Sequence, residues 1–116
     1  MEALKFLHGR SVMHRNLKPE NVLVDKCGSG GDIHVKVSDL SMSRSISFPN
    51  MQSYTPEDPK DRDRSGREAR RLWYRAPEFF FRQLVYGQEV DMWTVGCLLA
   101  EMARGDPLFV AESEIE

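Results

Sequence analysis

The chain contains 116 residues with a formal net charge of −2, a length that allows one domain or part of one. The charge argues against bulk nucleic-acid binding, and no apolar run reaches the ~20 residues that span a membrane. Met1 opens onto an amphipathic segment rather than a signal peptide, and Cys27 and Cys97 lack the spacing of a zinc site. We therefore expect free thiols in an intracellular protein of the cytoplasm, the nucleus or both.

The first third of the chain predicts a short helix followed by a β-hairpin. Residues 3–8 have helical apolar spacing and indicate the end of an amphipathic helix that stops at Gly9. Residues 21–25 predict a short buried strand, and residues 33–37 alternate apolar and polar side chains as a second strand. The Gly-rich segment 27–31 lacks a G-K-[ST] ending and precedes no helix, so we expect a hairpin turn rather than a phosphate-binding loop.

The rest of the chain predicts a long loop and then one strongly apolar helix. From residue 42 to about 71, prolines, serines and mixed charges are typical of a solvated loop, and loops of this length are often functional or disordered. Pro77 is well placed to begin a helix. Residues 90–103 are apolar on most sides, which predicts a buried helix with Trp93 in the core and its end at Gly105.

Two polar clusters stand at the two ends of the predicted hairpin. Residues 14–21 read His-Arg-Asn-Leu-Lys-Pro-Glu-Asn, and residues 38–41 read Ser-Asp-Leu-Ser. Because a hairpin brings its ends together, we expect four of these side chains to lie near one point: Asn16, Lys18, Asn21 and Asp39. One positive charge, one carboxylate and two amides suit the binding of phosphates and Mg²⁺.

These clusters resemble two motifs of protein kinases, the catalytic loop H-R-D-x-K-x-x-N and the metal-binding D-F-G. The resemblance continues in residues 73–78, Trp-Tyr-Arg-Ala-Pro-Glu, and in residues 91–96, with the order and spacing of a kinase C-lobe. The residues in these motifs are similar to those of cyclin-dependent kinases and their mitogen-activated relatives, the CMGC group. The resemblance implies an α+β fold, a mainly helical C-lobe fragment with a small β-hairpin at the catalytic loop.

The resemblance makes residues 1–116 a partial kinase domain and divides them into segments. These are the catalytic loop 14–21, the metal motif 39–41, the activation segment 39–78 with an insertion at about 58–67, and the buried helix at about 90–103. The Gly-rich loop, strand lysine and helix glutamate with which kinases cover ATP do not occur in this sequence. We therefore expect the N-lobe to be absent and ATP binding by this chain alone to be weak.

The resemblance also implies cofactors and catalytic roles. Asn21 and Asp39 match the residues that hold Mg²⁺, and Lys18 matches the lysine that neutralises the transferred phosphate of ATP. Asn16 stands at the position of the catalytic Asp, which takes a proton from the substrate hydroxyl. Because an amide cannot accept that proton, the rate should fall by ~10²–10⁴. Ser41 replaces the glycine of D-F-G and restricts the backbone there.

Further residues match regulatory and structural positions. Arg15 matches the arginine that pairs with a phosphorylated activation loop, and Thr55 is the candidate phosphorylation site, although a Thr-Pro pair is also an ordinary turn. Arg71 replaces a threonine and should repel Lys18 and pair with Asp39 instead. Three residues match structural positions: His14 in packing, Glu78 at the end of the activation segment, and Asp91 as the anchor of the catalytic loop.

Three functions follow as alternatives. The first is a serine/threonine kinase acting on a protein substrate, and the second is a pseudokinase or scaffold that binds a protein, with a cyclin as one candidate. The third is a truncated product without independent function. We expect no nucleic-acid or membrane partner. His8 and His34 show no sign of a partner and are expected at the surface. Because the helix before the catalytic loop is short and helix 90–103 lacks covering helices, we expect exposed apolar surface and aggregation.

Overall fold

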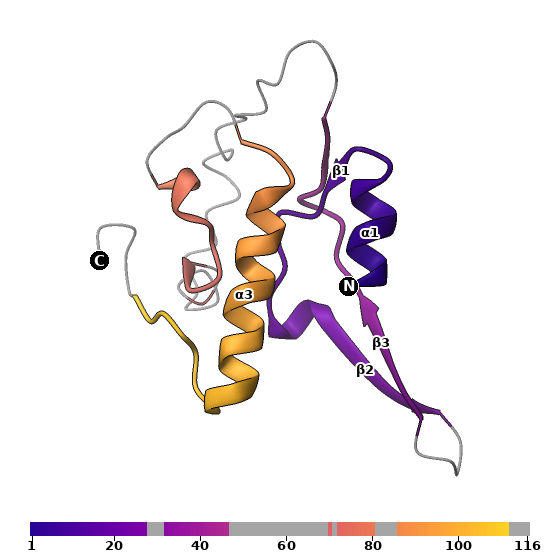
Figure 1. The fold of residues 1–116 in the computed structure, drawn as a ribbon, viewed down its shortest axis with the longest axis vertical. Helices are drawn as coiled ribbons and strands as arrows, with labels where there is room; N and C mark the ends of the chain where they lie inside the picture. The colour runs from indigo at the N-terminus through magenta and orange to yellow at the C-terminus, as the bar shows by residue number, and fades with distance from the viewer. Residues whose placement is uncertain (28–31, 47–69, 71, 81–85, 112–116) are drawn as a thin grey trace.

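The computed structural model describes residues 1–27, 32–46, 70, 72–80 and 86–111 (Figure 1). The predicted α+β class is confirmed, because two α-helices accompany short antiparallel strands in these ranges. Neither α-helix is both long and apolar enough to cross a membrane. In chain order the elements are α1 (Glu2–His8), β1 (Val12–Met13), the 3₁₀ turn η1 (Pro19–Asn21), β2 (Val22–Cys27), β3 (Asp32–Val37), β4 (Arg44–Ser45), the 3₁₀ turn η3 (Pro77–Phe79) and α3 (Glu89–Arg104).

The strands form two separate antiparallel pairs, and both bring the chain back to the loop at residues 14–21. β2 pairs with β3 from Val22 opposite Val37, which confirms the predicted hairpin; the predicted turn at 28–31 lies outside the described residues. β4 then returns beside β1, with Val12 opposite Ser45. Because both pairs close around the same loop, the residues after β3 lie next to the residues after β1.

The hairpin is far more exposed than the sequence predicts. Residues 21–25 were expected to form a buried strand, but Leu23 and Val24 are more than half exposed, and so are Ile33 and Val35 on β3. Figure 1 shows β2 and β3 extending away from the two helices. The prediction of burial was wrong because, within the described part of the chain, the two strands pack chiefly on each other and no helix covers them.

Helix α3 is buried along one face only. Its end at Gly105 is confirmed: this residue has φ 87°, and its N–H donates to Glu101 O at 2.8 Å. The buried positions follow helical spacing and are Val90, Asp91, Thr94 and Cys97. Trp93 lies on another face, is 40% exposed and stacks on Phe109 with 5.8 Å between ring centroids. The prediction that Trp93 lies in the core is therefore wrong, since the buried core packs against the Val90 face of the helix.

A small core joins the loop to α3. Met13, which ends β1, is fully buried against Ala76, Tyr86 and Val90. Phe79 of η3 packs on this cluster, 4.6 Å from Tyr86 between ring centroids. Pro77 begins η3, as its position in the sequence predicts. This core fixes the start of the 14–21 loop against the first turn of α3.

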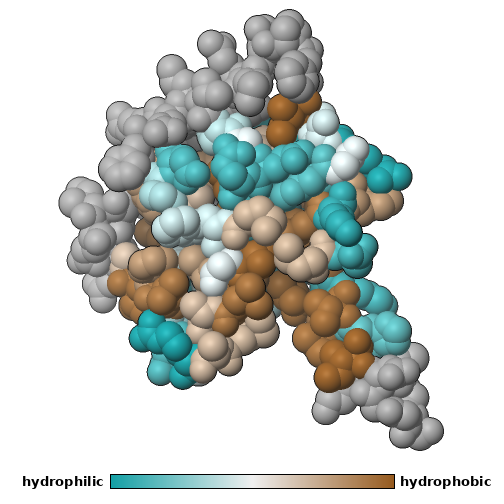
Figure 2. Space-filling model, viewed as in Figure 1, coloured by the Kyte–Doolittle hydropathy of each residue, from teal (hydrophilic) through white to brown (hydrophobic). Residues whose placement is uncertain are grey.

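The exposed apolar surface leads to a prediction about solution behaviour. Figure 2 shows apolar residues gathered over the hairpin and over the lower end of α3, where Leu99 and Met102 are 57% and 73% exposed. We expect the purified chain to bind the dye ANS and to aggregate on heating, because such patches associate in water. The double variant Leu99→Lys/Met102→Glu should reduce dye binding and aggregation while the far-UV circular dichroism spectrum is unchanged. A reversible, cooperative thermal transition without dye binding would contradict this expectation.

Candidate functional site

The 14–21 loop is attached to the end of the hairpin through a fully buried histidine. His14 Nε2 lies 2.9 Å from the carbonyl oxygen of Ser38. A carbonyl only accepts hydrogen bonds, so this ring nitrogen carries the proton. The other nitrogen, Nδ1, accepts the N–H of Asn16 at 3.3 Å. A neutral imidazole thus uses both ring nitrogens to hold two segments of the candidate site together.

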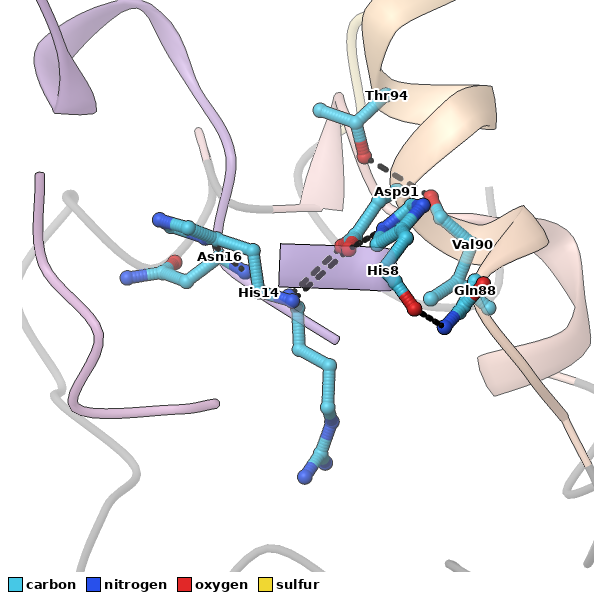
Figure 3. A network of polar contacts seen from close by, with 8 residues as sticks. His8, His14, Asn16, Gln88, Val90, Asp91 and Thr94 are labelled. Atoms are coloured by element: carbon cyan, nitrogen blue, oxygen red, sulfur yellow. Dashed lines mark hydrogen bonds and ion pairs between the residues drawn. The ribbon is translucent and has the colours of Figure 1, made fainter. Parts of the chain in front are cut away.

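A second attachment comes from α3. Asp91 is 1% exposed and accepts the backbone N–H of His14 at 2.8 Å through Oδ2 and that of Arg15 at 2.8 Å through Oδ1. Figure 3 shows the carboxylate between His8 and the loop. His8 Nε2 lies 2.8 Å from Asp91 Oδ2, and Gln88 Nε2 donates to His8 O at 2.7 Å. The expectation that His8 is a surface residue without a partner was wrong, because its partner lies 83 residues away in sequence.

Two residues of the site have a left-handed backbone conformation. Arg15 has φ 67° and Asp39 has φ 64°, values that L side chains rarely adopt. Such residues cost of order 1–3 kcal/mol each and persist where the surroundings hold them. Here Asp91 holds the N–H of Arg15, and the side chain of Asn16 holds the carboxylate of Asp39.

Three of the four predicted side chains meet at one point. Asn16 Nδ2 donates to Asp39 Oδ2 at 2.8 Å. Asn21 Nδ2 donates to the carbonyl oxygen of Asn16 at 2.7 Å and lies 3.4 Å from Asp39 Oδ2. Lys18 is half-buried on the same loop, and its ammonium makes no hydrogen bond or ion pair with the residues described. The polar centre therefore contains two amides and one carboxylate, and the predicted fourth member, Lys18, makes no hydrogen bond or ion pair with these described residues.

Ser41 adds two further donors to the same carboxylate. Its hydroxyl donates to Asp39 Oδ1 at 2.5 Å, and its backbone N–H donates to the same oxygen at 3.3 Å. The Ser41 hydroxyl, the Ser41 N–H and the two amides hold the pKa of Asp39 below its usual value, although partial burial acts in the opposite direction. Asp39 is thus a carboxylate anion at neutral pH.

The amide of Asn16 has only one of its two ends paired. Its nitrogen must face Asp39 because a carboxylate only accepts hydrogen bonds. The oxygen Oδ1 is buried and has no hydrogen-bond partner among the residues described. An unpaired buried acceptor costs ~1–3 kcal/mol. The site therefore keeps one acceptor that a ligand hydroxyl could satisfy.

The segment before α3 also packs on the site. Tyr74 is buried, its hydroxyl donates to Glu101 Oε2 at 2.6 Å, and its carbonyl accepts from Thr94 Oγ1 at 2.8 Å. Burial and the bond to Glu101 raise the pKa of Tyr74. Arg15 lies over the ring of Tyr86 at 5.6 Å, and Glu78 is half-buried in η3. The predicted residues Thr55, Arg71 and the insertion at about 58–67 lie outside the described residues.

Comparison with known proteins decides the family. A family model described as a protein kinase domain matches residues 1–116. The chain belongs to the protein kinase family. It is 39% identical over 115 residues to cyclin-dependent kinase B2-1 of Oryza sativa subsp. japonica, covering 99% of this chain and 30% of that kinase. It is 43% identical over 113 residues to mitogen-activated protein kinase 15 of Caenorhabditis elegans, covering 97% of this chain and 22% of that kinase.

The fold agrees with this assignment. The crystal structure of the yeast RNA Pol II CTD kinase CTDK-1 complex matches with a TM-score of 0.72 and 32% sequence identity, over 96% of this chain and 31% of that one. The predicted resemblance to cyclin-dependent kinases is thereby confirmed. The chain spans less than a third of the length of each kinase named here.

The kinase family uses ATP and Mg²⁺, so the fit of the polar centre to a magnesium ion matters. Mg²⁺ needs oxygen ligands and usually one or two carboxylates together with phosphates. No group of three or more His, Cys, Asp or Glu side chains that could hold a metal occurs in the described ranges. Asp39 is the one carboxylate of the cluster, and N–H or O–H donors face both of its oxygens. In this arrangement the residues do not fit Mg²⁺.

Proposed function

We propose that the chain is the catalytic-loop part of the C-lobe of a serine/threonine protein kinase in which phosphoryl transfer is impaired. One observation supports this proposal: the amide nitrogen of Asn16, the residue that by resemblance matches the catalytic Asp, donates to Asp39 at 2.8 Å. The side chain is therefore a hydrogen-bond donor toward Asp39 and has no basic group to offer a substrate.

The chemistry of the amide decides what the site can do. In phosphoryl transfer the base accepts the proton of the substrate hydroxyl while positive charges stabilise the phosphate. A hydroxyl can donate a hydrogen bond to Asn16 Oδ1, the buried acceptor that lacks a partner among the residues described. It cannot lose its proton there, because a neutral amide is not a base at neutral pH. Lys18, on the same loop, would supply positive charge to a phosphate.

The proposal includes a nucleotide, a substrate class and a partner class. ATP is the phosphate donor, the serine or threonine hydroxyl of a protein is the acceptor, and Asn16, Lys18, Asn21 and Asp39 form the site. The relative named cyclin-dependent kinase B2-1 supports a cyclin as a candidate partner. In this proposal residues 39–78 form the activation segment, with Thr55 as its phosphorylation site and Arg15 as the partner of the phosphate.

The test places the whole chain in a complete kinase domain. In a chimaera, residues 1–116 replace the segment that they match in the C. elegans mitogen-activated protein kinase 15. We expect the chimaera to bind a fluorescent ATP analogue and to phosphorylate a generic basic protein ~10²–10⁴ more slowly than the unaltered relative. Titration of the analogue and single-turnover transfer of labelled phosphate measure the two properties separately.

The controls distinguish the alternatives. A chimaera that transfers phosphate as fast as the relative would contradict impairment. A folded chimaera that neither binds the analogue nor transfers phosphate would contradict the proposed nucleotide binding and phosphoryl transfer. A protein-binding scaffold would then be the function to test. The circular dichroism spectrum of the chimaera shows whether it is folded.

A further inference from the structure

We propose that Ser41 is a specificity-determining residue whose hydroxyl, together with the Asn16 amide, closes Asp39 to divalent cations. The inference rests on the proposed function for the identity of its ligand, a nucleotide phosphate, which this site would hold without help from Mg²⁺. The closure of Asp39 to cations depends only on the hydrogen-bond geometry around its carboxylate.

The first carboxylate oxygen of Asp39, Oδ1, accepts two hydrogen bonds from Ser41. The chain turns sharply at Asp39, where φ is 64°, so that the residue two positions later points back at its side chain. The hydroxyl of Ser41 reaches Oδ1 at 2.5 Å, and the backbone N–H of the same residue reaches it at 3.3 Å. A carboxylate only accepts, so the hydroxyl must donate its proton toward Oδ1. A glycine at this position would provide the N–H without the hydroxyl.

The second carboxylate oxygen, Oδ2, faces the side-chain amides of Asn16 and Asn21. Asn16 Nδ2 lies 2.8 Å from Oδ2, and Asn21 Nδ2 lies 3.4 Å from it. The orientation of the Asn21 amide is fixed, because its nitrogen also donates to the carbonyl oxygen of Asn16 at 2.7 Å. A carboxylate has about four lone-pair positions. Within the described residues, each oxygen therefore faces two donors, one at 2.8 Å or less and one at 3.3 or 3.4 Å.

A cation competes with these donors at a disadvantage. To bind either oxygen it must displace an N–H or O–H group, and the positive ends of the remaining groups repel it. Mg²⁺ also gives up its water reluctantly and usually relies on one or two carboxylates together with phosphates. The closure is local, because among the described residues only Ser41 and Asn16 make hydrogen bonds of 2.8 Å or less to Asp39. Removing either donor should open one oxygen.

The experiment is a titration of the full chain with Mn²⁺, which shares the preference of Mg²⁺ for octahedral oxygen ligands. Electron paramagnetic resonance counts the free ion directly and needs no catalytic activity. We expect the wild-type chain to bind Mn²⁺ weakly, and Ser41→Ala and Asn16→Ala, each of which removes a donor without adding a ligand, to tighten binding ~10-fold. The double variant should bind more tightly than either single variant. Adding Asp39→Asn to the double variant should abolish the gain.

A matched control lies in the same turn. Ser43 also donates its hydroxyl to a neighbouring oxygen, that of Leu40 at 2.6 Å, but does not touch Asp39. Ser43→Ala should leave Mn²⁺ binding unchanged. Equal Mn²⁺ affinity in the wild-type chain, Ser41→Ala and Asn16→Ala, with folding verified by circular dichroism, would overturn the inference. So would a gain that survives Asp39→Asn.

This test is independent of the test of the proposed function. Fast phosphate transfer by the chimaera would end the proposal of impaired catalysis without deciding whether Ser41 blocks a cation. Unchanged Mn²⁺ affinity in the Ser41 and Asn16 variants would contradict the proposed closure of Asp39. It would not affect the proposal that the site lacks a base at Asn16. A nucleotide titration of the chimaera with and without Mg²⁺ adds a second readout. Mg²⁺ should not raise the affinity of the unmodified chimaera and should raise that of the Ser41→Ala chimaera.

Discussion

Replacing Asn16 with aspartate is expected to raise the rate of phosphoryl transfer by ~10²–10⁴ in the kinase chimaera that carries this chain. The substitution supplies a carboxylate that can take the proton of the substrate hydroxyl. It also removes the amide that now donates to Asp39 at 2.8 Å. Two carboxylates in contact repel each other and raise one pKa, which places the expected gain toward the lower end of the range.

Single-turnover transfer of labelled phosphate measures this gain, and a second substitution identifies its cause. Asn16→Ala removes the donor to Asp39 without adding a base. If the base is what the site lacks, Asn16→Ala stays as slow as the unmodified chimaera while Asn16→Asp accelerates. Equal rates for both variants would show that release of Asp39, and not proton transfer, limits the reaction.

Replacing Asp91 with asparagine is expected to release the 14–21 loop from α3. The carboxylate is 1% exposed and accepts two backbone N–H groups, each at 2.8 Å. An amide of the same size offers one oxygen, so one buried N–H would face an NH₂ group instead of an acceptor. Breaking a buried charged contact of this kind costs ~3 kcal/mol or more. The loss should be concentrated in the loop, because the hairpin β2–β3 makes no contact with Asp91 in the described network.

Amide hydrogen exchange measures this local loss. The N–H groups of His14 and Arg15 should exchange about 100-fold faster in Asp91→Asn than in the wild-type chain, since 3 kcal/mol corresponds to about two powers of ten. Asp106→Asn is the matched control, because this carboxylate is exposed beyond the end of α3. Unchanged protection at His14 and Arg15 would show that the core around Met13 holds the loop without Asp91.

The sequence predicts the local features of this chain well. Pro77, Gly105 and the alternation in residues 33–37 act through neighbouring backbone. The start of a helical turn at Pro77, the end of α3 and the hairpin therefore appear where they are expected, although the described turn at Pro77 is a three-residue 3₁₀ turn. The meeting of Asn16, Asn21 and Asp39 follows from the hairpin, because a hairpin has to bring its ends together.

What the sequence does not predict depends on partners far along the chain or on what covers a surface. Trp93 and the strand at 21–25 have core composition but find little to pack against in the described residues. His8 gives no local sign of its contact with Asp91. The backbone N–H of Ser41 is different: a carboxylate that accepts the N–H two residues later is a known local pattern, so Asp39 could have indicated this bond.

The contact between Asp91 and the loop also bears on the order of events during synthesis. His14 and Arg15 leave the ribosome first, but their acceptor follows 77 and 76 residues later. At ~5–20 residues per second, about 4–15 s pass before α3 can reach them. During that interval the left-handed residue Arg15 has no carboxylate to hold it, so the loop must wait in other conformations while the local hairpin can already form. The nascent chain should therefore form its β-hairpin before the 14–21 loop takes its final conformation.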